Sequence, residues 1–142
     1  MKVGVIGAGG RMGRLLVKLC QETDGMTVVA ASEVPGSPLL GQDAGDLAGV
    51  GRLGVAVGDS AEAVFEAADT VIEFSIPSAT AAHASLAAKH GAAFVVGTTG
   101  LDAAQEGALK AAAASVPIVY APNMSVVVNV FMNLVERVAS IL

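Results

Sequence analysis

The sequence GAGGRMG occupies residues 7–13 and directly follows a short apolar run at residues 2–6. Its glycines are spaced as a strand-to-helix turn requires. Gly7 permits a sharp turn, Gly10 lets backbone amides approach a bound group, and Gly13 lets the following helix lie close to the strand. The stretch therefore predicts a strand, a tight turn and a helix in immediate succession, the unit from which parallel α/β sheets are built.

This stretch departs from the strict G-x-G-x-x-G pattern, because Met12 stands where the third glycine belongs and Gly9 is additional. The helix that begins near Arg11 would point its free N–H groups and the positive end of its dipole at a phosphate. Glu33 closes the second expected strand, 33 − 13 = 20 residues past Gly13, where dinucleotide-binding folds place an acid on the adenosine ribose hydroxyls. We therefore expect a dinucleotide site, with a solvated loop glutamate as the alternative for Glu33.

Short apolar runs alternate with alanine-rich stretches along the whole chain. This alternation predicts a Rossmann-like α/β fold: a doubly wound parallel sheet of about six strands, with helices on both faces. The expected strands cover residues 2–6, 26–30, 55–57, 70–74, 93–96 and 117–120, and the expected helices cover residues 12–21, 61–67, 78–90, 103–114 and 125–142.

Helix starts and one long connection can also be identified. Asp59 with Glu62, and Asp102 with Gln105, have the spacing of capping boxes. Residues 33–54 contain six glycines and form the longest irregular stretch, which is longer than ordinary connections and typical of a functional or mobile loop.

Two further segments follow expected strands, at the edge where parallel sheets bind ligands. In the first, Gly97-Thr98-Thr99-Gly100, the glycines permit close backbone approach while hydroxyls and amides could hold a carboxamide; an ordinary helix-entry turn is the alternative. In the second, Ala121-Pro122-Asn123-Met124, Asn123 is either a ligand contact or a turn residue.

Composition excludes several classes of protein. Residues of hydrophobic type make up 54% of the chain and charged residues 15%, with a net charge of -5, which argues against a nucleic-acid partner because such proteins need clustered Lys and Arg. The apolar segment 125–142 is interrupted by polar and charged residues, so we expect no membrane span and a cytoplasmic protein.

The cysteine and histidine content predicts no metal site. The single Cys20 excludes an internal disulfide and is expected to fill the core. His83 and His90 share a helix face, but no third ligand lies at metal-binding spacing, so they are expected to be surface or helix-end residues.

Taken in order, residues 7–14, Gly41-Gln42-Asp43-Ala44-Gly45, residues 97–100 and Asn123-Met124-Ser125 resemble the bacterial dihydrodipicolinate reductases (4-hydroxy-tetrahydrodipicolinate reductases) of lysine biosynthesis. The resemblance implies hydride transfer from NADH or NADPH to a cyclic imine-type small-molecule substrate. It also implies that residues 7–12 hold the diphosphate and that Glu33 holds the adenosine ribose. Residues 97–99 would then lie on the nicotinamide side, and residues 121–124 would form the strip where cofactor meets substrate. The implied cofactor-binding residues are Gly7, Ala8, Gly9, Gly10, Arg11, Met12, Glu33, Gly97, Thr98, Thr99, Ala121, Pro122, Asn123 and Met124.

Two departures from the family pattern shape the expectation. Family members often carry Arg after the ribose acid to meet a 2′-phosphate, whereas this chain has Val34, so we lean slightly to NADH. The family's paired histidines, Lys and Ser-Gly-Thr loop come after Leu142, so no catalytic residue can be assigned here.

We therefore expect residues 1–124 to form the NAD(P)-binding domain and residues 125–142 a helix leading toward a substrate domain absent from this chain. By itself the chain should have little or no activity. Its last helix carries an apolar stripe that should promote self-association, and a homo-oligomer is expected. The alternatives are another amino-acid-pathway dehydrogenase, such as an aspartate-semialdehyde or homoserine dehydrogenase, and a non-catalytic dinucleotide-sensing module.

Overall fold

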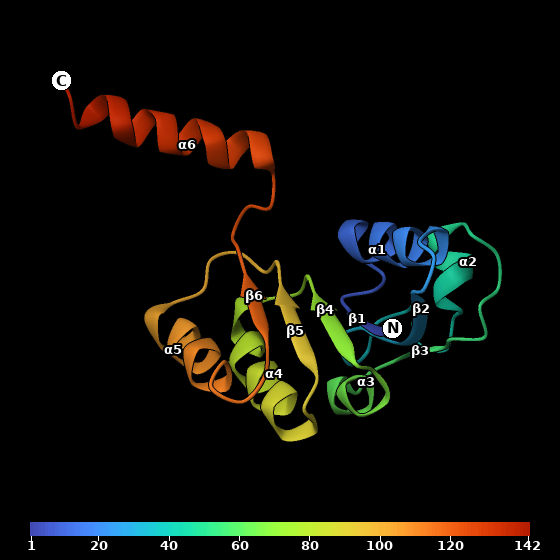
Figure 1. The fold of residues 1–142 in the computed structure, drawn as a ribbon. Coiled ribbons are helices and arrows are strands. Elements are labelled where there is room, and N and C mark those ends of the chain that lie inside the picture. Colours follow the sequence, from blue (N-terminus) through green and yellow to red (C-terminus); the bar gives the residue numbers. More distant parts are fainter.

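The computed structural model describes residues 1–142, as six strands and six helices in strict alternation (Figure 1). The strands are β1 (Lys2–Ile6), β2 (Thr27–Ser32), β3 (Val57–Gly58), β4 (Thr70–Glu73), β5 (Ala93–Val96) and β6 (Ile118–Tyr120). The helices are α1 (Arg11–Glu22), α2 (Ala44–Ala48), α3 (Ala61–Ala67), α4 (Pro77–His90), α5 (Ala103–Ala112) and α6 (Val126–Ala139).

The strands form one sheet in the order β3-β2-β1-β4-β5-β6, and every neighbouring pair is parallel. The expected Rossmann-like fold is therefore confirmed. The chain runs outward in opposite directions from β1 and from β4, so the turns after these strands lie at the point where ligands bind in open α/β sheets. Ile6, the last residue of β1, is in register with Glu73, the last residue of β4.

Helices cover both faces of the sheet. Helices α1 and α2 lie together on one face, and α3, α4 and α5 lie on the other (Figure 1). Each layer encloses its own buried apolar cluster, one around Val3, Val17 and Val28 and the other around Phe65 and Phe94. Cys20 is buried in the first cluster, as expected, and burial raises the pKa of its thiol.

The structure corrects the sequence expectations in local detail. The third strand has two residues instead of three, and the second ends at Ser32, so Glu33 follows the strand directly. Helix α3 is capped by Ser60, whose hydroxyl accepts from the Ala63 amide, and not by Asp59. The capping box of Asp102 with Gln105 is confirmed.

The connection at residues 33–54 is organised around one carboxylate. It contains the short helix α2, which the sequence reading did not predict. The side chain of Asp43 accepts five backbone N–H groups at 2.7–3.3 Å, from both α2 and the returning chain: Gly45, Asp46, Leu53, Gly54 and Val55. Donation from the Leu53 amide and from the other backbone groups holds the pKa of Asp43 below its ordinary value.

Replacing this carboxylate should release the loop. Because the pKa of Asp43 is lowered on folding, its stabilising effect is full above the ordinary pKa of about 4 and is lost as the pH falls through the folded-state value. At neutral pH we expect Asp43→Ala to accelerate amide hydrogen exchange at residues 53–55 by about tenfold or more. Wild-type protein should show the same release in acid. The exposed Asp24→Asn is the matched control, and unchanged exchange in Asp43→Ala would contradict this account.

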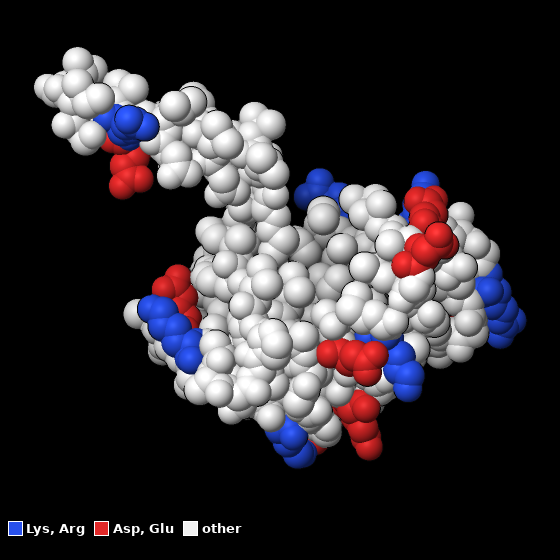
Figure 2. All heavy atoms as spheres, in the orientation of Figure 1, with Lys and Arg blue, Asp and Glu red and all other residues white.

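Helix α6 stands apart from the rest of the molecule. It projects beyond the end of β6 (Figure 1), and none of its residues is buried. Its large apolar side chains are therefore exposed, among them Val127 at 77% and Phe131 at 62%. Its charged residues, Glu136 and Arg137, lie near its C-terminal end (Figure 2). None of the six helices combines the length and the apolar character that a membrane span requires.

An apolar helix without a partner surface should drive self-association of this chain. We expect the purified chain to form concentration-dependent oligomers, and Phe131→Glu to shift them toward the monomer by introducing a charge into the apolar stripe. Asn133→Glu adds the same charge on the opposite side of α6 and should have a smaller effect. Sedimentation velocity measures both; a wild-type monomer at all concentrations would contradict the prediction.

Candidate functional site

The turn after β1 brings three segments of backbone into close contact. Gly7 has φ +79°, and a Cβ atom there would lie 2.2 Å from the Phe74 carbonyl oxygen. A Cβ atom at Gly13 would lie 2.1 Å from the Gly7 carbonyl oxygen and 2.6 Å from the Ala8 Cα. Only glycine fits at these two positions, so the start of α1 is held tightly against the ends of β1 and β4.

The first turn of α1 presents unused backbone donors. Gly10 caps the helix without a side-chain hydrogen bond, and the first turn contains no acidic residue. The N–H groups at a helix start have no partner within the helix, and the helix dipole adds partial positive charge there. Arg14 braces the turn, since its Nε donates to the Gly9 carbonyl oxygen at 2.8 Å. This helix start is suited to an anionic group such as a diphosphate.

Glu33 lies beside the same turn, as the sequence predicts. Its Oε1 accepts from the Gly9 amide at 2.7 Å, and its Oε2 accepts from the Val34 amide at 3.3 Å. A Cβ atom at Gly9 would lie 2.2 Å from Leu39 Cδ1 and 3.1 Å from Glu33 Oε1. The additional glycine of the motif therefore makes room for Glu33 and for the 33–54 loop.

Two cavities meet at the glycine turn. The first, of about 380 Å³, is lined by residues that follow β1, β2, β3 and β4, including Gly7, Gly10, Glu33, Val34, Asp59 and His83. The second, of about 670 Å³, is lined by the start of α1 and by the segments that follow β4, β5 and β6, including Arg11, Met12, Thr98, Thr99, Asn123 and Met124. Gly10, Phe74 and Ser75 line both cavities, so the two are contiguous.

The electrostatic character of the two cavities differs. Glu33 and Asp59 line the first cavity, and its one basic side chain is His83. Arg11 is the one charged residue that lines the second cavity. Between the charged groups at its margins, the face in Figure 2 is largely uncharged. The arrangement can hold an elongated ligand with an anionic centre at the helix start and a neutral group at each end.

Most of the predicted site residues line one of the two cavities, but Ala8 and Gly9 do not. Ala8 is buried, at 2% exposure, in the core beneath α1. Thr98 lines the second cavity, but its buried hydroxyl already accepts from the Ser75 amide at 2.9 Å. Thr99 is exposed and free to meet a ligand.

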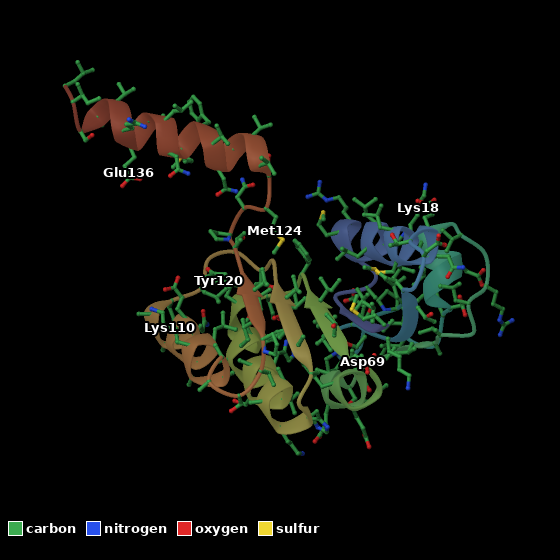
Figure 3. All side chains as sticks on the ribbon, in the orientation of Figure 1. Lys18, Asp69, Lys110, Tyr120, Met124 and Glu136 are labelled. Atoms are coloured by element: carbon green, nitrogen blue, oxygen red, sulfur yellow. The ribbon has the colours of Figure 1, made fainter.

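The segment after β6 forms the far wall of the second cavity. Asn123 Oδ1 accepts from the Ser125 amide at 2.8 Å, which leaves the Asn123 amide NH₂ group available. Figure 3 shows Met124 on the connection that leads from β6 to α6. Pro122 and Asn123 are exposed there, and Ala121 is half-buried.

The sequence reading missed a buried polar cluster beneath the glycine turn. Glu73, the last residue of β4, is fully buried and lies 2.8 Å from Nδ1 of His83. The expectation that His83 is a surface residue is therefore wrong, because α4 turns it inward against β4, whereas His90 does lie at a helix end. The sequence feature that could have indicated this buried cluster is the acidic Glu73 within the otherwise apolar run TVIEF at residues 70–74. No group of three or more His, Cys, Asp or Glu side chains is placed to hold a metal ion.

Comparisons with known proteins fit this site. The family described as "Dihydrodipicolinate reductase, N-terminus" matches residues 1–124. The 4-hydroxy-tetrahydrodipicolinate reductase of Alkalilimnicola ehrlichii is 49% identical over 138 residues, which are 97% of this chain and 52% of that protein.

Two solved structures share the fold. The dipicolinate-bound dihydrodipicolinate reductase of a Paenisporosarcina species aligns with a TM-score of 0.61 at 20% identity, over 80% of this chain and 43% of that one. The biliverdin reductase of a Synechocystis species, in complex with biliverdin and NADP+, aligns with a TM-score of 0.65 at 17% identity, over 82% of this chain and 36% of that one.

The chain spans about half the length of the curated relatives it matches, 52% of one and 53% of another. The family match covers the glycine turn, the 33–54 loop and every residue that lines the two cavities except Ser125. Together with the identity to a curated reductase over nearly the whole chain, it shows that the chain belongs to the dihydrodipicolinate reductase family and corresponds to its N-terminal part.

Proposed function

We propose that this chain is the cofactor-binding part of a 4-hydroxy-tetrahydrodipicolinate reductase and that it binds NADH in preference to NADPH. The observation that carries the proposal is the position of the open first turn of α1 between two contiguous cavities, with Glu33 at one side of it. Diphosphates bind at helix starts of this kind in parallel α/β sheets.

The proposed cofactor pose follows from the lining residues. The diphosphate lies over Gly10 with the amides of Arg11 and Met12, and the adenosine lies in the cavity of about 380 Å³ with its ribose hydroxyls against Glu33. The nicotinamide lies in the cavity of about 670 Å³, between the exposed Thr99 and the segment 121–124. A reduced nicotinamide supplies hydride there, and the protein's residues hold and orient the ring.

The preference for NADH rests on the charges around the adenosine cavity. A 2′-phosphate would meet two carboxylates, Glu33 and Asp59, and no Lys or Arg side chain lines this cavity. Val34 offers no positive charge, and Arg11 lines the other cavity. Repulsion between phosphate and carboxylate in a partly enclosed site should therefore disfavour NADPH.

We further propose that the complete enzyme transfers hydride to a cyclic dihydrodipicolinate-type intermediate in the cytoplasm. The 49% identity to a reductase of that name supports the substrate class. This chain supplies the cofactor site and no residue with an assigned role in proton transfer. The groups that bind and protonate the substrate would come from the half of the relatives' length that has no counterpart in the aligned region.

Calorimetric titration tests the cofactor preference. We expect NADH to bind at least about tenfold more tightly than NADPH to the wild-type chain, and Glu33→Ala to weaken NADH binding by about 10–100-fold, since a charge-assisted hydrogen bond is lost. Val34→Arg should narrow the preference by attracting the 2′-phosphate. Glu22→Gln, at the exposed end of α1, is the control. Tighter binding of NADPH by the wild type would contradict the preference.

Kinetic assays on the same chain test whether it binds the cofactor without carrying the groups that complete the reaction. With the substrate generated in the assay, we expect oxidation of NADH by this chain to stay at the uncatalysed background, because positioning of the nicotinamide without a proton donor does not complete the reaction. A full-length relative assayed in parallel provides the reference rate. Turnover by this chain close to that reference would show that its own residues include the catalytic groups.

A further inference from the structure

A fully buried carboxylate lies at the end of β4, beneath the glycine turn. Glu73 is 0% exposed, and its Oε1 accepts hydrogen bonds from the Ser75 hydroxyl and, at 3.4 Å, from the Thr80 hydroxyl. The same oxygen lies 2.8 Å from His83 Nδ1. Oε2 of Glu73 is buried and has no hydrogen-bond partner. A carboxylate in such a place requires a compensating charge or a bound proton.

His83 is the one basic group that faces Glu73. On α4, the other basic residues, Lys89 and His90, lie at the far end of the helix and contact Glu62. Helix α3 presents the ring of Phe65 to His83. The neighbouring strands β1 and β5 contribute no charged side chain, since their only ionisable residue is Lys2 at the opposite end of β1.

The other charges near His83 are negative. Glu33 and Asp59, from the turns after β2 and β3, line the same cavity as His83. Without a proton on the pair, this end of the sheet would carry three carboxylates close to the proposed diphosphate site. One proton held between Glu73 and His83 makes the pair electrically neutral.

The pair is connected to the walls of both cavities. Ser75 donates its hydroxyl to Glu73 and its amide to Thr98, and Ser75 lines both cavities. The Phe74 carbonyl between them lies against Gly7, where even a Cβ atom would not fit. Glu73 is therefore fully buried one residue before the carbonyl that packs on the proposed diphosphate turn, where a charge is screened less than it is at the surface.

We propose that Glu73 and His83 form a proton-holding pair that positions the glycine turn and makes dinucleotide binding dependent on pH. Binding of the doubly negative diphosphate favours the neutral, protonated pair over the form with an uncompensated Glu73 carboxylate. By linkage, the dinucleotide then binds more tightly at lower pH, and its binding takes up a fraction of a proton at any pH where the pair is only partly protonated in the free chain. This inference rests on the proposed function, and both groups are positioning residues that do not touch the cofactor.

Proton uptake tests the inference on the wild-type chain. NADH is the appropriate probe, because the 2′-phosphate of NADPH would itself titrate near pH 6. Calorimetric titrations in two buffers with different ionisation enthalpies give the number of protons taken up. We expect a fractional uptake between about pH 6 and 8 and a fall in affinity of about tenfold across that range.

Variants separate charge from structure. His83→Asn keeps a donor near the position of Nδ1, but the proton of the pair can then reside only on Glu73, so we expect the proton uptake and the pH profile of NADH binding to shift from those of the wild type. The double variant with Glu73→Gln has no ionisable side chain at the pair, so we expect no proton uptake and an NADH affinity that does not vary between about pH 6 and 8. His90→Asn, on the same helix, should behave as the wild type. Thermal unfolding of each variant identifies any loss of fold.

The possible results distinguish the inference from the proposed function. NADH binding by the wild type with no proton uptake, or by folded His83→Asn with the wild-type pH profile, overturns the inference and leaves the proposed function standing. A wild-type chain that binds neither NADH nor NADPH overturns both. If His83→Asn does not fold, the uptake measured on the wild type and on His90→Asn decides the question.

Discussion

The site depends on a steric constraint: three backbone segments meet where no Cβ atom fits. The carbonyl of Phe74 occupies the space beside Gly7, and the carbonyl of Gly7 occupies the space beside Gly13. A side chain at Gly7 would push the turn away from the end of β4, and a side chain at Gly13 would push α1 away from the turn. The first turn of α1 would then no longer face the junction of the two cavities, because the direction of a helix start is set by how closely the helix packs on its strand. The anion binding that we propose for this place therefore depends on the close packing of α1 as well as on charge.

The parallel sheet extends this local constraint into a site. Because the carboxyl ends of all six strands lie at one edge, the turns after β1, β2, β4, β5 and β6 converge there without direct hydrogen bonds between most of them. Two carboxylates then fix the less regular parts by accepting backbone amides. Glu33 joins the turn after β2 to the glycine turn through Gly9, and Asp43 closes the 33–54 loop on itself. These contacts do not use the amides at the start of α1, which is why we place the anionic part of the ligand there.

The sequence predicted those features that a few neighbouring residues determine. The glycine turn, the strand and helix alternation and the Asp102 capping box depend on local sterics and hydrogen bonds, and all were found as expected. Features that depend on tertiary contacts were missed or misplaced. Ser60 and Asp59 are both good caps, and only the path of the chain after β3 decides between them. The pairing of Glu73 with His83 joins a strand to the following helix across ten residues, and neither residue alone distinguishes a buried pair from two solvated side chains.

The proposed cofactor site and helix α6 occupy different parts of the chain. Every residue that lines either cavity lies at or before Ser125, whereas α6 buries no residue of its own. Isolated helices of this length are marginally stable in water, so α6 needs a surface to pack against, and its apolar stripe is available for one. Most walls of the proposed cofactor site are fixed without α6, by the sheet edge and by Glu33, Ser75 and Thr98. The exception is the segment 121–124, where Asn129 Nδ2 of α6 donates to the Asn123 carbonyl oxygen at 2.8 Å. Changes that alter what α6 packs against should therefore affect assembly and the wall at residues 121–124 while leaving the glycine turn and Glu33 in place.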